Sequence, residues 1–185
     1  AASSRIGQII IVTRDDLLAA ARALCGGEKK VCAVVPGGAT RAESVLNGLR
    51  RVEAPVVAIH DGARPLVTPE VIDTAISAAE KNGAAAPAVP VRDTIKIAEG
   101  GMVRATPDRA ALYAVQTPQV FATERIRAAL ADALEKALPL TDDCSAAEAA
   151  GLPVALTAGS EENIKITTPI DLVLAEAILR RRETT

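Results

Sequence analysis

Short runs of consecutive apolar residues alternate with stretches of helical period along the first half of this sequence. Each run is short enough for a strand and lacks polar alternation, which is typical of a strand covered on both faces. Strand, helix and strand at this spacing predict a parallel sheet with right-handed crossovers. The expected strands are 8–12, 31–35 and 55–59, and the expected helices are 15–24, 41–50 and 68–82.

The length of 185 residues is that of one domain. We therefore expect residues 1–185 to form a single α/β domain with a doubly wound, mostly parallel sheet of the Rossmann-like kind. The helical period returns after the middle of the chain, from Thr123. A last helix is expected from Thr168, at a Thr-Pro cap, to the basic run at 180–182.

The rhythm of strands and helices breaks between Val89 and Gln119, where two alternating segments flank Glu99–Gly101. This pattern predicts a β-hairpin arm over residues 91–106. Two strands alone are marginal in water, so the arm must pack on its own domain or on a partner. We expect it to join two copies of the chain as a homodimer.

Composition excludes several classes of protein. Lys and Arg number 21 against 23 Asp and Glu, and aromatic residues make up 1% of the chain. A nucleic-acid binder with a basic surplus or a base-stacking surface is therefore not expected. Three scattered cysteines and one histidine favour neither disulfides nor zinc. No apolar run is long enough to cross a membrane, and Ala1–Arg5 lacks a signal-peptide pattern, so a cytoplasmic location is expected.

Three loops bring polar residues to the carboxyl ends of expected strands, where open parallel sheets bind ligands. The first loop, 36–41, contains two glycines and is followed by Ser44. Glycines let a ligand approach the backbone, and the next helix offers free N–H groups at its start. The same pattern also fits an ordinary tight turn.

The second loop is His60–Pro65, in which Asp61 follows a buried strand and Arg64 comes three residues later. A carboxylate suits a hard cation such as Mg²⁺, and a guanidinium binds phosphate through paired N–H groups. The alternative is an Asp61–Arg64 ion pair that shapes the turn. His60 should point to the opposite face, which favours a structural role over that of a general base.

The third loop, 160–168, carries Lys165 between two isoleucines. A solvated strand lysine is the usual explanation for such a residue, and only its convergence with the other loops favours a function. The predicted arm adds Arg92 and Lys96, and Arg109 follows it, although a basic strand edge also protects against aggregation.

Six segments together carry a family resemblance: Gly37–Val45, His60–Pro65, Pro90–Lys96, Gln116–Gln119, Leu140–Asp143 and Asn163–Thr167. They span nearly the whole chain and resemble, in order, the 2-C-methyl-D-erythritol 4-phosphate cytidylyltransferases of the non-mevalonate isoprenoid pathway. The resemblance implies a reaction of CTP with a methylerythritol phosphate that gives a cytidine diphospho-alcohol and pyrophosphate. It also implies Mg²⁺ and a dimer joined through the arm.

The resemblance also implies roles for individual residues. The positions expected to contact the nucleotide are Gly38, Ala39, Ser44, Asp61 and Gly62, with Asp61 also the metal ligand. The positions expected to bind the alcohol phosphate are Arg64, Thr94, Arg109, Thr117 and Lys165. The residues expected to assist the transfer itself are Asp61, Arg109 and Lys165.

The family also has a glycine-rich A-A-G-x-G-x-R loop and a P-K-Q lysine that surround the triphosphate, and this sequence contains neither. The expectation is an N-terminally truncated chain, catalytically incompetent as given, with a gap where the first strand would pair. Two alternatives are a pentitol-phosphate cytidylyltransferase and a non-catalytic nucleotide-binding or dimerisation module.

Overall fold

The first two strands form a parallel pair of their own. In the computed structural model, which describes residues 3–184, β1 (Ile9–Thr13) pairs with β2 (Val31–Pro36). The short 3₁₀ turn η1 (Asp15–Leu17) and α1 (Leu18–Cys25) connect them, as the helical period predicted. The expectation that the sequence has no signal-peptide pattern rests on residues 1–5, of which residues 1 and 2 lie outside the described part.

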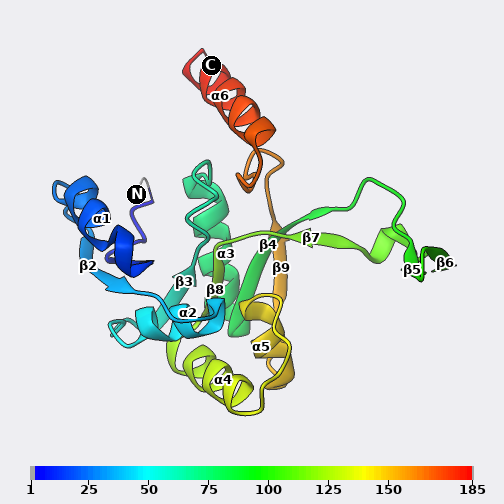
Figure 1. Ribbon diagram of the computed structural model, residues 1–185, viewed down its shortest axis with the longest axis horizontal. Helices are drawn as coiled ribbons and strands as arrows, with labels where there is room; N and C mark the ends of the chain where they lie inside the picture. The colour runs from blue at the N-terminus through cyan, green and yellow to red at the C-terminus, as the bar shows by residue number, and fades with distance from the viewer. Residues whose placement is uncertain (1–2, 185) are drawn as a thin grey trace.

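The main sheet has five strands and mixed directions (Figure 1). β3 (Val56–Ile59) pairs with β8 (Gln119–Ala122), which runs antiparallel to it and to β4 (Ala84–Pro90). β7 (Tyr113–Val115) also runs antiparallel to β4, whereas β9 (Ala155–Ala158) is parallel to it. The predicted α/β class is confirmed. Parallel pairing does not extend across the sheet, because β7 and β8 return from the arm in the opposite direction.

Helices cover both faces of this sheet, and strand alternation separates two cores. Phe121 and the neighbouring alanines of β4 pack on one face, against residues from α2 (Arg41–Leu49), α4 (Thr123–Glu135) and α5 (Asp143–Ala149). Val120 packs on the other face, against α3 (Pro69–Asn82). The sheet is therefore buried on both sides, as its apolar strands predicted.

A cleft of about 1040 Å³ separates the β1–β2 pair from the main sheet. Within residues 3–184, β1 pairs only with β2, and β3 pairs only with β8, so each has an edge without a strand partner. The cleft is lined by both of these strands and by parts of α2 and α3. The predicted gap in strand pairing is therefore present.

The predicted arm is also present and extends away from the body of the molecule (Figure 1). It consists of β5 (Ile97–Glu99) and β6 (Met102–Ala105), joined by Gly100 and Gly101 at φ of 57° and 77°. This left-handed backbone favours glycine. The first strand begins at Ile97, three residues later than the alternating pattern begins at Thr94.

The last helix, α6 (Pro169–Glu183), begins with a capping box formed by Thr168 and Asp171. It also projects from the body, at the top of Figure 1. No helix within residues 3–184 has the length and apolar character that crossing a membrane requires.

Candidate active site

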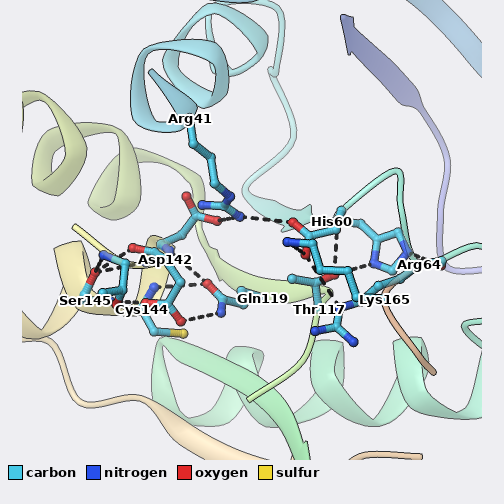
Figure 2. A network of polar contacts seen from close by, with 12 residues as sticks. Arg41, His60, Arg64, Thr117, Gln119, Asp142, Cys144, Ser145 and Lys165 are labelled. Atoms are coloured by element: carbon cyan, nitrogen blue, oxygen red, sulfur yellow. Dashed lines mark hydrogen bonds and ion pairs between the residues drawn. The ribbon is translucent and has the colours of Figure 1, made fainter. Parts of the chain in front are cut away.

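Three cationic side chains from distant parts of the sequence surround the Asp61 carboxylate. Lys165 Nζ lies 3.1 Å and Arg64 Nε 3.5 Å from Asp61 Oδ2, and Arg41 Nη2 lies 3.6 Å from Asp61 Oδ1. Figure 2 shows Arg41, Arg64 and Lys165 directed into one network. The Asp61 and Arg64 side chains are only 15% and 14% exposed, so water screens their contact poorly, whereas Arg41 and Lys165 are 40% and 46% exposed and their contacts are screened more.

The balance of charge around Asp61 is positive. Burial by itself would raise the pKa of Asp61, but Lys165, with Arg41 and Arg64, outweighs burial and holds the pKa below its ordinary value. Asp61 is therefore ionised at neutral pH. Arg41 also pairs with Asp143, so two carboxylates face three cations, and the remaining positive charge suits a phosphorylated ligand.

The backbone of the Asp61 loop is fixed by Thr117 and His60. The Asp61 N–H donates to Thr117 Oγ1 (3.0 Å), and Thr117 Oγ1 lies 2.9 Å from His60 Nδ1. His60 Nε2 lies 2.9 Å from the Arg64 carbonyl oxygen, which can only accept, so Nε2 carries the proton. Burial lowers the pKa of His60, which favours the neutral ring. This use of both nitrogens fits the predicted structural role of His60.

The loop that carries Lys165 is tied to the same place. Arg64 Nη1 donates to the Asn163 carbonyl oxygen (2.7 Å), and the Ile166 N–H donates to the Ala63 carbonyl oxygen (2.8 Å). Asn163 is fully buried, and its Nδ2 donates to the Thr117 carbonyl oxygen (2.9 Å). The predicted convergence of the second and third loops therefore has a physical basis in these bonds.

The glycine loop before α2 is held tightly. The Gly38 N–H donates to Ser44 Oγ (3.0 Å), and the Ser44 hydroxyl donates to the Thr40 carbonyl oxygen (2.8 Å). A Cβ at Gly38 would lie 2.3 Å from Glu43 Cβ, and a Cβ at Gly37 would lie 2.8 Å from Ser44 Oγ. Both are closer than real Cβ contacts allow. Close packing is thus one reason for glycine here, whatever ligand approaches.

Of the predicted nucleotide-contacting residues, Ser44, Asp61 and Gly62 line the cleft between β1 and β3, as does Lys165. A Cβ built at Gly62 would meet no atom within 4 Å, so this position opens onto free space. Gly38 and Ala39 lie in the neighbouring loop before α2 and do not line the cleft.

The 2-C-methyl-D-erythritol 4-phosphate cytidylyltransferase family model matches residues 1–181. A protein of that name from Desulforamulus reducens is 54% identical over 156 residues, which are 83% of this chain and 67% of the relative. One from Syntrophotalea carbinolica is 51% identical over 154 residues, 82% of this chain and 66% of the relative. The matched part thus spans about two thirds of the length of these relatives.

Solved structures agree with the sequence comparison. The 2-C-methyl-D-erythritol 4-phosphate cytidylyltransferase of Thermus thermophilus is 39% identical, with a TM-score of 0.78 over 94% of this chain and 82% of that one. The 4-diphosphocytidyl-2C-methyl-D-erythritol synthase of Anaerococcus prevotii is 33% identical, with a TM-score of 0.88 over 96% of this chain and 82% of that one. The chain belongs to the 2-C-methyl-D-erythritol 4-phosphate cytidylyltransferase family.

This cytidylyltransferase-family chain does not bring all the predicted site residues together. Within residues 3–184, no hydrogen bond or ion pair joins Thr94 or Arg109 directly to Asp61, Arg64 or Lys165. Arg109 Nη1 instead donates to the Arg92 carbonyl oxygen (2.6 Å), and both residues are exposed near the base of the arm. The site therefore divides into an assembled part around Asp61 and a separate part made of Thr94 on the arm and Arg109 just after it.

Sequence reasoning assigned no role to four residues that organise the assembled part: Arg41, Gln119, Asp143 and Asn163. Asp143 and Asn163 are fully buried, and Gln119 is nearly so. All four lie within the segments that carried the family resemblance, so their positions were marked but their contacts were not. A buried polar residue implies a partner, but only the fold shows which one.

A divalent cation would find one carboxylate here. Among the described residues, no group of three or more His, Cys, Asp or Glu side chains is placed to hold a metal. Three cations already lie within 3.6 Å of the Asp61 oxygens. Mg²⁺ commonly binds through one or two carboxylates together with substrate phosphates. The residues present therefore fit a metal that arrives with a nucleotide, not a metal bound by the protein alone.

Proposed function

We propose that this chain transfers the cytidylyl group of CTP to 2-C-methyl-D-erythritol 4-phosphate and releases pyrophosphate. The observation that carries the proposal is the Asp61 cluster, in which Arg41, Arg64 and Lys165 gather around one carboxylate in a family of cytidylyltransferases. Excess positive charge at the edge of a cleft is what a reaction between two phosphorylated substrates requires.

In the proposed reaction, the phosphate oxygen of the alcohol phosphate attacks the α-phosphorus of CTP in line. A new P–O bond forms while the bond between the α-phosphorus and the oxygen bridging to the β-phosphate breaks. The bonding electrons leave with pyrophosphate. The chain needs no covalent intermediate, so its contribution is orientation and neutralisation of charge.

Each group of residues has a part in this proposal. Lys165 and Arg109 position the reacting phosphates, and Arg64 binds the alcohol phosphate. The Thr117 hydroxyl already serves Asp61 and His60, so Thr117 shapes the pocket by holding the Asp61 loop. Asp61 would hold Mg²⁺ together with the triphosphate, and the ion would supply further neutralisation of phosphate charge.

We propose that the residues near the start of α2 hold the nucleoside. Gly38 and Ala39 would contact cytidine from the loop before α2, Ser44 from the first half of α2, and Gly62 from the loop after β3. Support comes from the open space at Gly62 and from the position of Ser44 on the cleft wall. The unpaired edges of β1 and β3 also suit a further strand, whose end would lie beside this loop.

We propose that the arm joins two copies of the chain and brings Thr94 and Arg109 to the partner's Asp61 cluster. The apolar arm residues Ile97, Met102 and Val103 are 54%, 68% and 59% exposed, which is costly for an arm that stays in water. A cytoplasmic location is proposed as well, because all three cysteines are free thiols.

The test is turnover by the protein that carries this chain, with CTP, Mg²⁺ and either 2-C-methyl-D-erythritol 4-phosphate or a pentitol phosphate. Faster pyrophosphate release with the methylerythritol phosphate is expected. Preference for the pentitol phosphate would replace the substrate assignment. CTP binding without turnover of either alcohol would favour a non-catalytic module and overturn the proposed activity.

A further inference from the structure

Arg41 bridges two carboxylates that are 82 positions apart in the sequence. Its Nη2 lies 2.7 Å from Asp143 Oδ2 and 3.6 Å from Asp61 Oδ1. Asp143 is the first residue of α5, whereas Asp61 follows β3. A single guanidinium thus links the assembled part of the site to a helix that takes no other part in it (Figure 2).

The far end of this bridge is rigidly held. The backbone N–H groups of Asp143 and Cys144 both donate to Gln119 Oε1 at 3.0 Å. Gln119 Nε2 donates in turn to Asp142 Oδ2 (2.6 Å), the residue that caps α5. Gln119 therefore fastens the first turn of α5 to β8.

The same strand also places the near end. Gln119 is the register partner of Ile59, two residues before Asp61 in the chain. These links form a closed ring. The chain leads from Asp61 back to Ile59 in β3, which pairs with Gln119 in β8. Gln119 holds Asp143, and Asp143 pairs with Arg41, which returns to Asp61. A closed ring restricts the carboxylate more than a single ion pair at a surface would.

Burial explains why Arg41 cannot turn away from Asp143. The Asp143 side chain is 0% exposed, and its Oδ1 has no hydrogen-bond partner within the described residues. Arg41 supplies the only cation that the structure places on this carboxylate within residues 3–184. Loss of that contact would leave a buried, unpaired charge, which is strongly disfavoured. The Arg41 side chain is itself 40% exposed and lines the cleft beside Asp61 and Lys165.

We propose that Arg41 is a positioning residue for the reaction, which holds the Asp61 carboxylate in its working orientation while Asp143 holds Arg41. This inference rests on the proposed function for its catalytic consequence, but the ring itself does not depend on that function. Asp143 acts only through Arg41 and touches no substrate. Asp143 also neutralises the charge of Arg41, so that Arg41 compensates less of the charge of Asp61.

The kinetic test compares variants of the protein that carries this chain. Asp143→Asn keeps the size of the side chain and removes the charge that anchors Arg41. We expect kcat to fall about 10- to 100-fold with a smaller change in the KM for CTP, as for other residues that orient a reacting group. Arg41→Met should fall by at least as much, and Arg41→Lys should recover only part of the loss, because an ammonium group lacks the planar fork.

Arg127 provides the matched control. Its side chain is 33% exposed and does not line the cleft, although its Nη2 donates to the carbonyl oxygens of Leu49 and Val52, at 2.9 and 3.0 Å, and both of these residues do. Arg127→Met should lower the melting temperature and leave kcat unchanged. Equal kcat losses in Arg127→Met and Asp143→Asn would overturn the proposal. So would additive losses in the Arg41→Met, Asp143→Asn double variant, because residues of one ring must be coupled.

A second measurement is independent of turnover. In protein labelled with ¹⁵N-arginine, NMR reports whether rotation of the Arg41 guanidinium is restricted. We expect slow rotation in the wild type and fast rotation in Asp143→Asn, with the Arg127 signals unchanged. Fast rotation in an active wild type would refute the ring. Slow rotation in a wild type that does not turn over CTP would support the ring and refute the proposed function instead.

Discussion

The Asp61 cluster and the arm are two opposite ways of presenting functional side chains. The Asp61 side chain is 15% exposed and is contacted from α2, its own loop and the Lys165 loop. Every residue of β5 and β6 is exposed, and Arg104 pairs with Glu99 in open solvent. Packing fixes the cluster within one chain, whereas the arm has little to pack against. The part of the proposed site around Asp61 is thus assembled within one chain and the part on the arm is not, which is the reason for proposing that a second copy completes it.

The largest effect is expected from removing the arm. Deletion of residues 93–105 should convert a dimer into a monomer and abolish turnover, because it removes Thr94 and the exposed apolar strands together. Sedimentation and pyrophosphate release measure the two losses. If the wild type sediments as a monomer, the arm does not join two copies, and the proposed contrast between the arm and the Asp61 cluster is wrong.

A mixing experiment sharpens the same comparison. Thr94→Val alters the arm and Lys165→Met alters the cluster, so each homodimer should be nearly inactive. A heterodimer of the two should regain one intact site. If heterodimers form and activity does not return, the arm does not serve its neighbour.

The next largest effect is expected within the cluster itself. Lys165→Met keeps an apolar stem of similar reach but removes the cation 3.1 Å from Asp61. We expect kcat to fall about 100- to 1,000-fold, as when an enzyme loses one group that stabilises developing charge. Lys136→Met is the matched control, since Lys136 pairs with Asp132 one helical turn away at an exposed position. A similar kcat loss in both variants would contradict the assignment.

A smaller effect is expected from the support beneath Asp61. Thr117→Val removes the oxygen that accepts the Asp61 N–H. A buried donor without a partner should lower the free energy of unfolding by about 1–3 kcal/mol. Thr117→Ser keeps the hydroxyl and should lose less. Chemical denaturation compares the two, and equal losses would show that this hydrogen bond does not stabilise the loop.

The smallest effect is expected on the arm surface. Arg104→Ala breaks an ion pair whose side chains are 61% and 78% exposed. Such pairs contribute about 0–1 kcal/mol, so the melting temperature and the dimer dissociation constant should hardly change. A large loss of dimer would show that Arg104 contacts the partner and that this part of the arm, exposed in the single chain, is buried in the dimer.

Sequence patterns predicted the elements that have a strong period and missed those that do not. The arm, α3 and α4 follow clear alternation or helical spacing, and their presence is confirmed. β4 was missed, because Ala84–Pro90 consists of four alanines, two prolines and one valine, a composition that disfavours strands. Its first five residues are nevertheless buried in the middle of the sheet, where packing against both cores outweighs local preference.

The candidate site was predictable to a similar degree. The rule that ligands bind beyond the strand ends was enough to bring Asp61, Arg64 and Lys165 together. The link from Arg41 to Asp143 was not predictable, because it depends on how Gln119 fixes the start of α5 across 24 residues. No spacing of residue types in the sequence predicts a side-chain contact of that kind.

The tight contact at Gly38 has a consequence for how this sequence can vary. The clash distance of 2.3 Å is measured to Glu43 Cβ, an atom that every residue except glycine would place there. Substitutions at position 43 other than to glycine therefore cannot make room at position 38 unless the first turn of α2 moves. Position 43 can accept other residue types as far as the helix cap permits. Position 38 must stay glycine, because the Cβ of almost any residue at position 43 would clash with a side chain there. An alignment of relatives should show this asymmetry, with a fixed glycine opposite a variable partner.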